Sequence, residues 1–141
     1  MWKCFDMIIK TTPDNEKVKS VLRLIKEREE FISFADSSRF STSVVENYYE
    51  IIKELAGALI LLDGLKATGE NAHKDLINYL INYEEFLEED IVFMNDLRIK
   101  RNNSSYEGKR INSVYFQNNK NKILSIILRL KEIIKRRINY P

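Results

Sequence analysis

One short stretch of the sequence gathers side chains that could contact phosphate groups. It covers residues 101–108, Arg-Asn-Asn-Ser-Ser-Tyr-Glu-Gly, with cationic side chains on both flanks. Arginine is a planar donor that matches phosphate oxygens, Asn, Ser and Tyr add hydrogen bonds, and a tyrosine can stack on an unpaired base. The candidate nucleic-acid contacts are Arg98, Lys100, Arg101, Lys109 and Arg110. The stretch predicts a phosphate-contacting loop between two helices. The alternative is an ordinary polar loop whose Asn and Ser side chains cap helix ends.

The distribution of charge along the chain, more than its total, points to a partner. The formal net charge is +2, yet residues 1–97 hold 11 basic and 19 acidic side chains, whereas residues 98–141 hold 12 basic and 2 acidic ones. A segment this basic suits an anionic partner, and nucleic acid is the obvious candidate. A second interpretation is internal, because the acidic part could neutralise the basic part within one fold or across a dimer.

The sequence offers little to a metal, a disulfide or a membrane. Cys4 is the only cysteine and His73 the only histidine, so no disulfide can form within the chain, and we expect neither a metal nor a cofactor. The longest apolar run, residues 55–62, is far shorter than a membrane span. The first ten residues lack the apolar core of a secretory signal. We therefore expect a cytoplasmic protein with no membrane contact.

Composition indicates that helices must position the candidate residues. The chain has 141 residues, about one domain, and contains only 4 Gly and 2 Pro. A β-sandwich or barrel of this length needs many more turn residues. A hydrophobic share of 44% excludes a disordered tail. We predict an all-α fold, with one antiparallel bundle of about five helices over residues 12–141. Residues 1–11 are left open between a helical extension, a short strand and an arm.

Apolar residues at helical spacing predict where the five helices lie. The expected helices cover residues 12–35, 41–63, 71–86, 88–100 and 113–138, and residues 101–112 form a loop. Thr12 is the expected N-cap of the first helix, because Pro13 suits the first helical position. The second helix is apolar nearly all round, which places it at the centre of the bundle. Gly57, in its middle, predicts a close contact between helices there.

An ordered set of short segments is similar to a known family. In the second and third predicted helices the segments are YYEIIKEL (48–55), LLDGLK (61–66) and HKDLI (73–77). After the fourth helix come Leu97-Arg98, then Arg101-Asn102, then Tyr106-Glu107-Gly108. Together they resemble the HEPN superfamily (higher eukaryotes and prokaryotes nucleotide-binding), in particular its small stand-alone archaeal and bacterial members. The resemblance covers roughly residues 14–137 and implies an antiparallel helical bundle, often a homodimer.

The resemblance also implies a site. Many members are metal-independent endoribonucleases, and several are toxins paired with a minimal nucleotidyltransferase antitoxin. Their motif is Arg, a polar residue, three to five further residues and His, and two subunits contribute it to a cleft at the dimer interface. Here Arg101 and Asn102 match the first two positions, and Tyr106 stands where His is expected. A phenol has a pKa of about 10, so at neutral pH it is a poorer acid–base group than imidazole.

Three functions stay open. The first is a HEPN-like RNA- or nucleotide-binding protein in which Arg101 and Asn102 hold phosphate and Tyr106 stacks or hydrogen-bonds. The second is a metal-independent endoribonuclease with Tyr106 in place of the motif histidine, and the same three residues as its catalytic candidates. The third is a non-catalytic protein-interaction module, for instance for a nucleotidyltransferase. His73 is expected to be a partly buried polar residue near a helix start, without a catalytic role. The resemblance and the many apolar residues of the fourth and fifth helices predict a homodimer.

Overall fold

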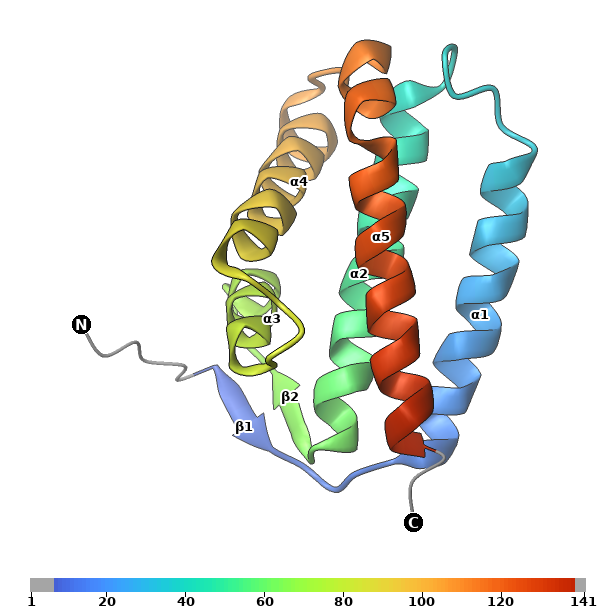
Figure 1. Cartoon of the computed structure of the whole chain (residues 1–141). Coiled ribbons are helices and arrows are strands. Elements are labelled where there is room, and N and C mark those ends of the chain that lie inside the picture. The colour runs from blue at the N-terminus through green and yellow to red at the C-terminus, as the bar shows by residue number, and fades with distance from the viewer. Residues whose placement is uncertain (1–6, 139–141) are drawn as a thin grey trace.

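Helices account for most of the structure, a computed structural model that describes residues 7–138 (Figure 1). The α-helices are α1 (Asn15–Ser33), α2 (Ser41–Leu62), α3 (Ala72–Tyr79), α4 (Glu88–Glu107) and α5 (Ser113–Ile138). The prediction of an all-α bundle of about five helices is confirmed. Within residues 7–138, none of the helices combines the length and apolar character that crossing a membrane requires.

The α2 helix lies at the centre of the bundle, as its apolar sequence predicts. It contacts α1, α3, α4 and α5, and Ile52, Leu55 and Leu59 on it are fully buried. Each such side chain contributes about 1.5–3 kcal/mol by leaving water. In Figure 1, α1 and α4 run in one direction and α2 and α5 in the other. The α2 and α5 helices are therefore parallel neighbours, and the hydroxyl of Ser41 at the start of α2 donates to the carbonyl of Ile111 just before α5 at 2.6 Å.

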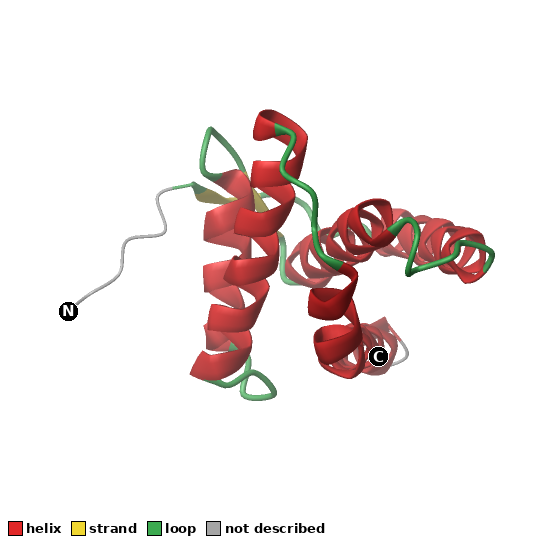
Figure 2. Ribbon diagram, turned by 90° about the horizontal axis from the view of Figure 1, so that it is seen from above, coloured by secondary structure: helices red, strands yellow, loops and turns green. Residues whose placement is uncertain are grey.

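A small antiparallel sheet joins the start of the described chain to the turn after α2. Strand β1 (Ile8–Lys10) pairs with β2 (Leu65–Ala67), and Figure 2 shows this pair as the small strand region beside the helices. The strand is thus the alternative observed for residues 8–10, while residues 1–6 lie outside the described residues. Three residues are too few to show a periodic pattern, so β2 was not predicted. Gly64, with φ +73°, forms the turn before β2, and its carbonyl accepts the Thr11 N–H at 2.7 Å.

The first helix begins later than predicted. Asp14 is its N-cap, and the carboxylate accepts the N–H of Lys17 at 2.9 Å. The expected cap at Thr12 is wrong because Asp14 supplies an equally good cap closer to the apolar stripe.

The third helix ends earlier than predicted. It stops at Tyr79, and a 3-10 turn covers Leu80–Asn82. Tyr83 then has an extended backbone, and its hydroxyl donates to the carboxylate of Asp63 at the end of α2. The predicted helix over residues 71–86 is therefore too long, because this long-range contact anchors the chain outside the helix.

Gly57 does not mark a close contact between helices, contrary to the sequence prediction. A Cβ atom built on Gly57 would meet nothing within 4 Å. The residue lies instead on the wall of a cavity that α1, α2, β2 and α3 surround. The missing side chain therefore enlarges this cavity, and no other helix of the described chain packs closely against Gly57.

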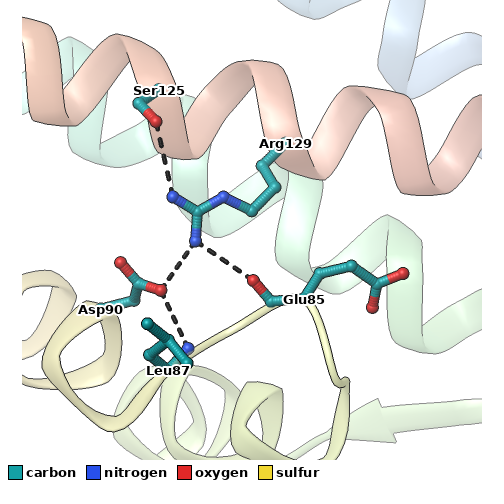
Figure 3. Close-up of polar contacts among 5 residues, drawn as sticks. All are labelled: Glu85, Leu87, Asp90, Ser125 and Arg129. Carbon is teal, nitrogen blue, oxygen red and sulfur yellow. Dashed lines mark hydrogen bonds and ion pairs between the residues drawn. The ribbon is translucent and has the colours of Figure 1, made fainter.

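An ion pair fixes the start of α4 against the middle of α5 (Figure 3). Arg129 Nη1 lies 2.7 Å from Asp90 Oδ2 and donates to the carbonyl of Glu85 at 3.2 Å. Its Nη2 donates to Ser125 Oγ at 3.4 Å. The same Asp90 oxygen accepts the N–H of Leu87 at 2.9 Å, so it also caps the first turn of α4. This junction orients the helix that carries the candidate site.

Candidate functional site

The predicted loop after residue 100 is part of a helix, because α4 continues unbroken to Glu107. The expectation of a loop over residues 101–112 is therefore wrong for its first seven residues. The hydroxyls of Ser104 and Ser105 donate to the carboxylate of Glu46 on α2, at 2.7 and 3.3 Å. These bonds hold otherwise weak helix formers in the helix. The helix ends at Gly108, whose φ of +67° is the left-handed conformation that glycine favours.

Because α4 continues, its candidate residues lie on one side of the helix and face the start of α3. A pocket of about 290 Å³ is lined on α4 by Arg98, Arg101, Asn102 and Tyr106. Arg101 and Asn102 lie three and four residues after Arg98, and Tyr106 lies four after Asn102, which is the spacing that puts side chains on one helix face. The other wall is formed by residues 69–74, including His73 and Lys74. The structure thus brings the three motif residues together and adds a histidine that the motif does not include.

The two arginines of this pocket have no carboxylate partner among residues 7–138. Arg98 Nε donates to Asn95 Oδ1 at 3.1 Å, and Asn95 donates to Asn78 at 2.8 Å, which links α4 to α3. The Arg101 guanidinium makes no hydrogen bond or ion pair in the described part of the chain. Both side chains are partly buried, and Glu70 is the one acidic residue in the pocket lining. Partly buried guanidinium groups without a counter-ion are suited to an incoming anion.

A buried tyrosine lies within the electrostatic reach of both arginines. Tyr49 of α2 is fully buried, and its hydroxyl has no hydrogen-bond partner in the described chain. Burial raises the pKa of Tyr49 to about 12, and the positive charges of Arg98 and Arg101 oppose this rise. The guanidinium charges therefore act on the interior side of α4 as well as on the pocket.

His73 is partly buried in the first turn of α3, as expected for a polar residue near a helix start. Burial lowers its pKa, the positive charges of Lys53 and Arg101 lower it further, and Glu50 opposes them. The imidazole is therefore neutral at pH 7 and can accept a proton. Its place beside the motif residues was missed, because 28 positions separate His73 from Arg101 and no local spacing connects them.

The other predicted nucleic-acid contacts do not line this pocket. Lys100 Nζ lies 4.6 Å from the centre of the Tyr115 ring of α5. Lys109 Nζ lies 3.9 Å from a carboxylate oxygen of the neighbouring Glu107. Arg110 lines a different pocket, together with Arg39 and other residues at the start of α2. Of the five predicted contacts, the structure brings only Arg98 and Arg101 into one pocket.

Several basic residues of α5 are paired within the fold. The pairs are Arg129 with Asp90, Lys131 with Glu29, Arg136 with Glu85 and Arg137 with Asp63. The acidic first part of the chain therefore neutralises much of α5, as the internal interpretation of the charge distribution predicts. Arg98 and Arg101 are not among these pairs, and they line one pocket together with Lys74.

No protein-family model, curated protein or solved structure matches this chain. The resemblance to the HEPN superfamily therefore stays a prediction that rests on the quoted motif residues. The physical argument for a function comes from the pocket between α3 and α4.

Proposed function

We propose that the pocket between α3 and α4 binds phosphate groups of RNA or of a nucleotide, and that the chain is a HEPN-like RNA- or nucleotide-binding protein. The observation that carries this proposal is the pair of partly buried arginines, Arg98 and Arg101, without a carboxylate partner among the described residues. Lys74 adds a third positive charge to the lining, and Asn102 adds a hydrogen-bond donor. Tyr106 is 77% exposed, so its ring is free to stack on an unpaired base.

The start of α3 supports the same kind of ligand. Asn71 precedes the helix without a side-chain hydrogen bond to cap it. The backbone N–H groups of His73 and Lys74 have no backbone acceptor within the described residues. Free N–H groups and the positive end of the helix dipole both favour an anion at this wall.

Binding of labelled single-stranded RNA, followed by fluorescence anisotropy at low salt, tests the proposal. Arg101→Ala removes a charge-assisted contact worth about 1.5–3 kcal/mol, so we expect affinity to fall by about tenfold or more. Lys135→Ala removes the same unit of charge from an exposed position on α5 and serves as the matched control. Equal affinities of the two variants would contradict the assigned pocket. Absence of RNA binding at low salt would favour the protein-interaction module, with a nucleotidyltransferase as its partner.

One observation favours a metal-independent endoribonuclease as the second candidate. His73 lines the same pocket as Arg101 and Asn102, so an imidazole is present although Tyr106 occupies the motif position. In this reaction the RNA 2′-oxygen attacks the adjacent phosphorus and the bond from phosphorus to the 5′-oxygen breaks. His73 accepts the 2′-hydroxyl proton, Arg101 stabilises the charged phosphorane, and the departing 5′-oxygen takes a proton from water. The products are a 2′,3′-cyclic phosphate and a 5′-hydroxyl.

Cleavage of labelled RNA in the presence of a chelator separates the two candidates. An endoribonuclease of this kind cleaves without metal, and His73→Gln lowers the rate by about 10²–10⁴ if the imidazole is the general base. Intact RNA after incubation with wild-type protein would leave binding as the function. Cleavage that His73→Gln does not slow would exclude His73 as the base.

The homodimer stays part of the proposal, and of the two helices that suggested it, α4 now supports it better than α5. On α5 the apolar residues are mostly used within the chain, since Ile123, Ile126, Ile127 and Leu130 are buried. On α4, Val92 and Ile99 lie seven residues apart on one stripe and are 58% and 47% exposed. Such a stripe can pack against its copy on a second chain in the manner of a coiled coil. Light scattering that gives the single-chain mass of 16.7 kDa at all micromolar concentrations would contradict it.

A further inference from the structure

We propose a second binding site in the cavity that α1, α2, β2 and α3 surround, and that its ligand is a small organic anion with an apolar body. The cavity has a volume of about 440 Å³, within the range of about 300–1,000 Å³ that is usual for small-molecule sites. It is a different cavity from the phosphate pocket, although His73 and Ala72 line both. Ligand binding in this cavity does not require that the chain binds RNA.

The inner wall of this cavity is apolar. It is made by Val21 of α1, Gly57, Ala58 and Leu61 of α2, Leu65 of β2 and Leu76 of α3. Four separate elements therefore contribute apolar surface to one space. An apolar group that enters this space leaves water, which favours its binding in proportion to the area that it buries.

Gly57 enlarges the cavity at a cost to the helix. A glycine inside a helix is less favourable than alanine, because it loses more backbone freedom on folding. No steric reason within the described chain requires glycine here, because a Cβ atom would meet nothing within 4 Å. The backbone at Gly57 has no positive φ. Packing within the described chain therefore does not explain a glycine at position 57. A ligand in the cavity would use the space that the missing side chain leaves.

The rim of the cavity is positively charged. The lining holds three lysines, Lys17, Lys53 and Lys66, and one carboxylate, that of Glu54. Glu54 is already paired with Arg28 at 2.6 Å, and Lys53 is paired with Glu50 at 2.7 Å. The ammonium groups of Lys17 and Lys66 have no partner in the part of the chain that the structure describes.

This distribution of charge selects the class of ligand. A carboxylate, sulfonate or phosphate ester can approach the two unpaired lysines while its aliphatic or aromatic body lies on the apolar wall. A cation would meet three lysines, and a neutral hydrocarbon would leave the lysines without a partner. The pKa of His73 is lowered, so its imidazole stays neutral near pH 7 and acts as a hydrogen-bonding group on this rim.

The test uses 8-anilinonaphthalene-1-sulfonate, an aromatic sulfonate whose fluorescence rises in an apolar site, with octanoate as a displacing ligand. We expect saturable binding of one dye molecule per folded chain, displacement by octanoate, and weaker displacement by the uncharged octanol. Gly57→Leu fills the cavity and should lower the affinity for the dye by about tenfold or more. Gly57→Ala adds one methyl group and should keep most of the affinity, so it is the matched control.

A second pair of variants tests the charge. Lys17→Ala combined with Lys66→Ala should weaken binding of the sulfonate dye itself, so each displacement is converted to an affinity with the dye affinity of the same variant. On that scale the double variant should lower the affinity for octanoate and leave the affinity for octanol unchanged. Lys19→Ala combined with Lys26→Ala removes two exposed lysines of α1 that do not line the cavity, and it should change neither. This pair also keeps the proposal testable if Gly57→Leu does not fold. Absence of saturable dye binding, or wild-type affinity in folded Gly57→Leu, would overturn the proposal, and so would an unchanged affinity for octanoate in the Lys17 and Lys66 double variant.

Discussion

Asp90 and Arg129 form an ion pair of 2.7 Å in which one carboxylate serves two helices. Asp90 is 5% exposed, it caps the first turn of α4 through the N–H of Leu87, and it holds the guanidinium that projects from α5. The candidate residues of the phosphate pocket lie on the later turns of the same α4 helix. The position of the pocket wall therefore depends on a contact at the opposite end of the helix.

Replacing Asp90 by alanine tests this dependence. The substitution removes a helix cap and leaves Arg129 without its counter-ion, and we expect the free energy of unfolding to fall by about 1–3 kcal/mol. The Arg129 side chain is 30% exposed, so water can solvate it, which keeps the loss below that of a fully buried pair. Urea unfolding followed by circular dichroism measures the change. Glu89→Ala, at an exposed position in the same turn, is the control, and equal losses would contradict the prediction.

Salt dependence tests how many phosphates the protein contacts. If four phosphates of single-stranded RNA are neutralised, log K falls with log salt with a slope of about −3. The paired residues of α5 are engaged with carboxylates and should contribute little to this slope, whereas Arg98 and Arg101 should contribute. Arg101→Ala should make the slope shallower by about 0.7, and Arg136→Ala should leave it nearly unchanged. Binding that does not vary with salt would favour the protein-interaction module.

Much of the fold could be predicted from the sequence, because long apolar stripes specify helices without any knowledge of partners. The stripe of α5 predicts its bounds of Ser113–Ile138 correctly. The central place of α2 follows from an apolar surface that only burial on several sides can satisfy. The end of α4 could not be predicted, because Ser104 and Ser105 are held in the helix by Glu46, which lies 58 and 59 positions away.

The candidate site could be predicted only in part, because the sequence shows local groups of residues but not the packing of distant helices. Arg101, Asn102 and Tyr106 are close in sequence, so their grouping was visible, and the continuing helix keeps them in one pocket. His73 and Lys74 form the facing wall through the packing of α3 on α4, which no local pattern encodes. The sequence predicts a close contact between helices at Gly57, because sequence alone cannot distinguish a glycine that packs against another helix from a glycine that lines a cavity.

His73 provides a direct probe of the pocket, because it is the only histidine in the chain. We expect its Hε1 resonance to titrate below the usual pKa of about 6.5, since burial and the neighbouring cations disfavour the charged form. Arg101→Ala removes one of these cations and should raise the pKa of His73. Added inorganic phosphate should also raise it if the anion enters the pocket. Lys135→Ala is the control, and a pKa that neither phosphate nor Arg101→Ala moves would place the anion elsewhere.

The same lowered pKa predicts how stability changes with pH. The unfolded chain has the higher pKa at this position, so as pH falls through about 6.5 it takes up the proton before the folded chain does. The contribution of neutral His73 to the free energy of unfolding is therefore fully present above this pH. It is lost as the pH falls from about 6.5 to the lower pKa that His73 has in the folded chain. Urea midpoints at several pH values should fall less steeply for His73→Gln than for wild type over this interval. Parallel pH profiles would contradict the lowered pKa of His73.

Gly57→Ala tests whether the space over α2 is open. Alanine is favoured over glycine in a helix by about 1 kcal/mol, and nothing lies within 4 Å of the added methyl group. We therefore expect the free energy of unfolding to rise by about 0.5–1 kcal/mol in urea unfolding. Gly108→Ala is the contrasting variant, because φ is +67° there and alanine should destabilise the chain. A loss of stability in Gly57→Ala would mean that the helix packs closely at this position.

Variants of Tyr106 distinguish RNA binding from RNA cleavage at the motif. The Tyr106→Phe variant loses only the hydroxyl, so a stacking role predicts a change in RNA affinity of no more than one hydrogen bond, about 0.5–1.5 kcal/mol. If the hydroxyl takes part in the chemistry, the same variant should lower the cleavage rate by about 10²–10⁴. Tyr106→His restores the residue that the HEPN motif expects, beside Arg101 and Asn102 in the same pocket. It should create or raise metal-independent cleavage of labelled RNA if the pocket can hold a scissile phosphate. If Tyr106→His and Arg101→Ala both leave RNA binding and cleavage as they are in wild type, this pocket does not contact nucleic acid, and a protein partner becomes the leading proposal.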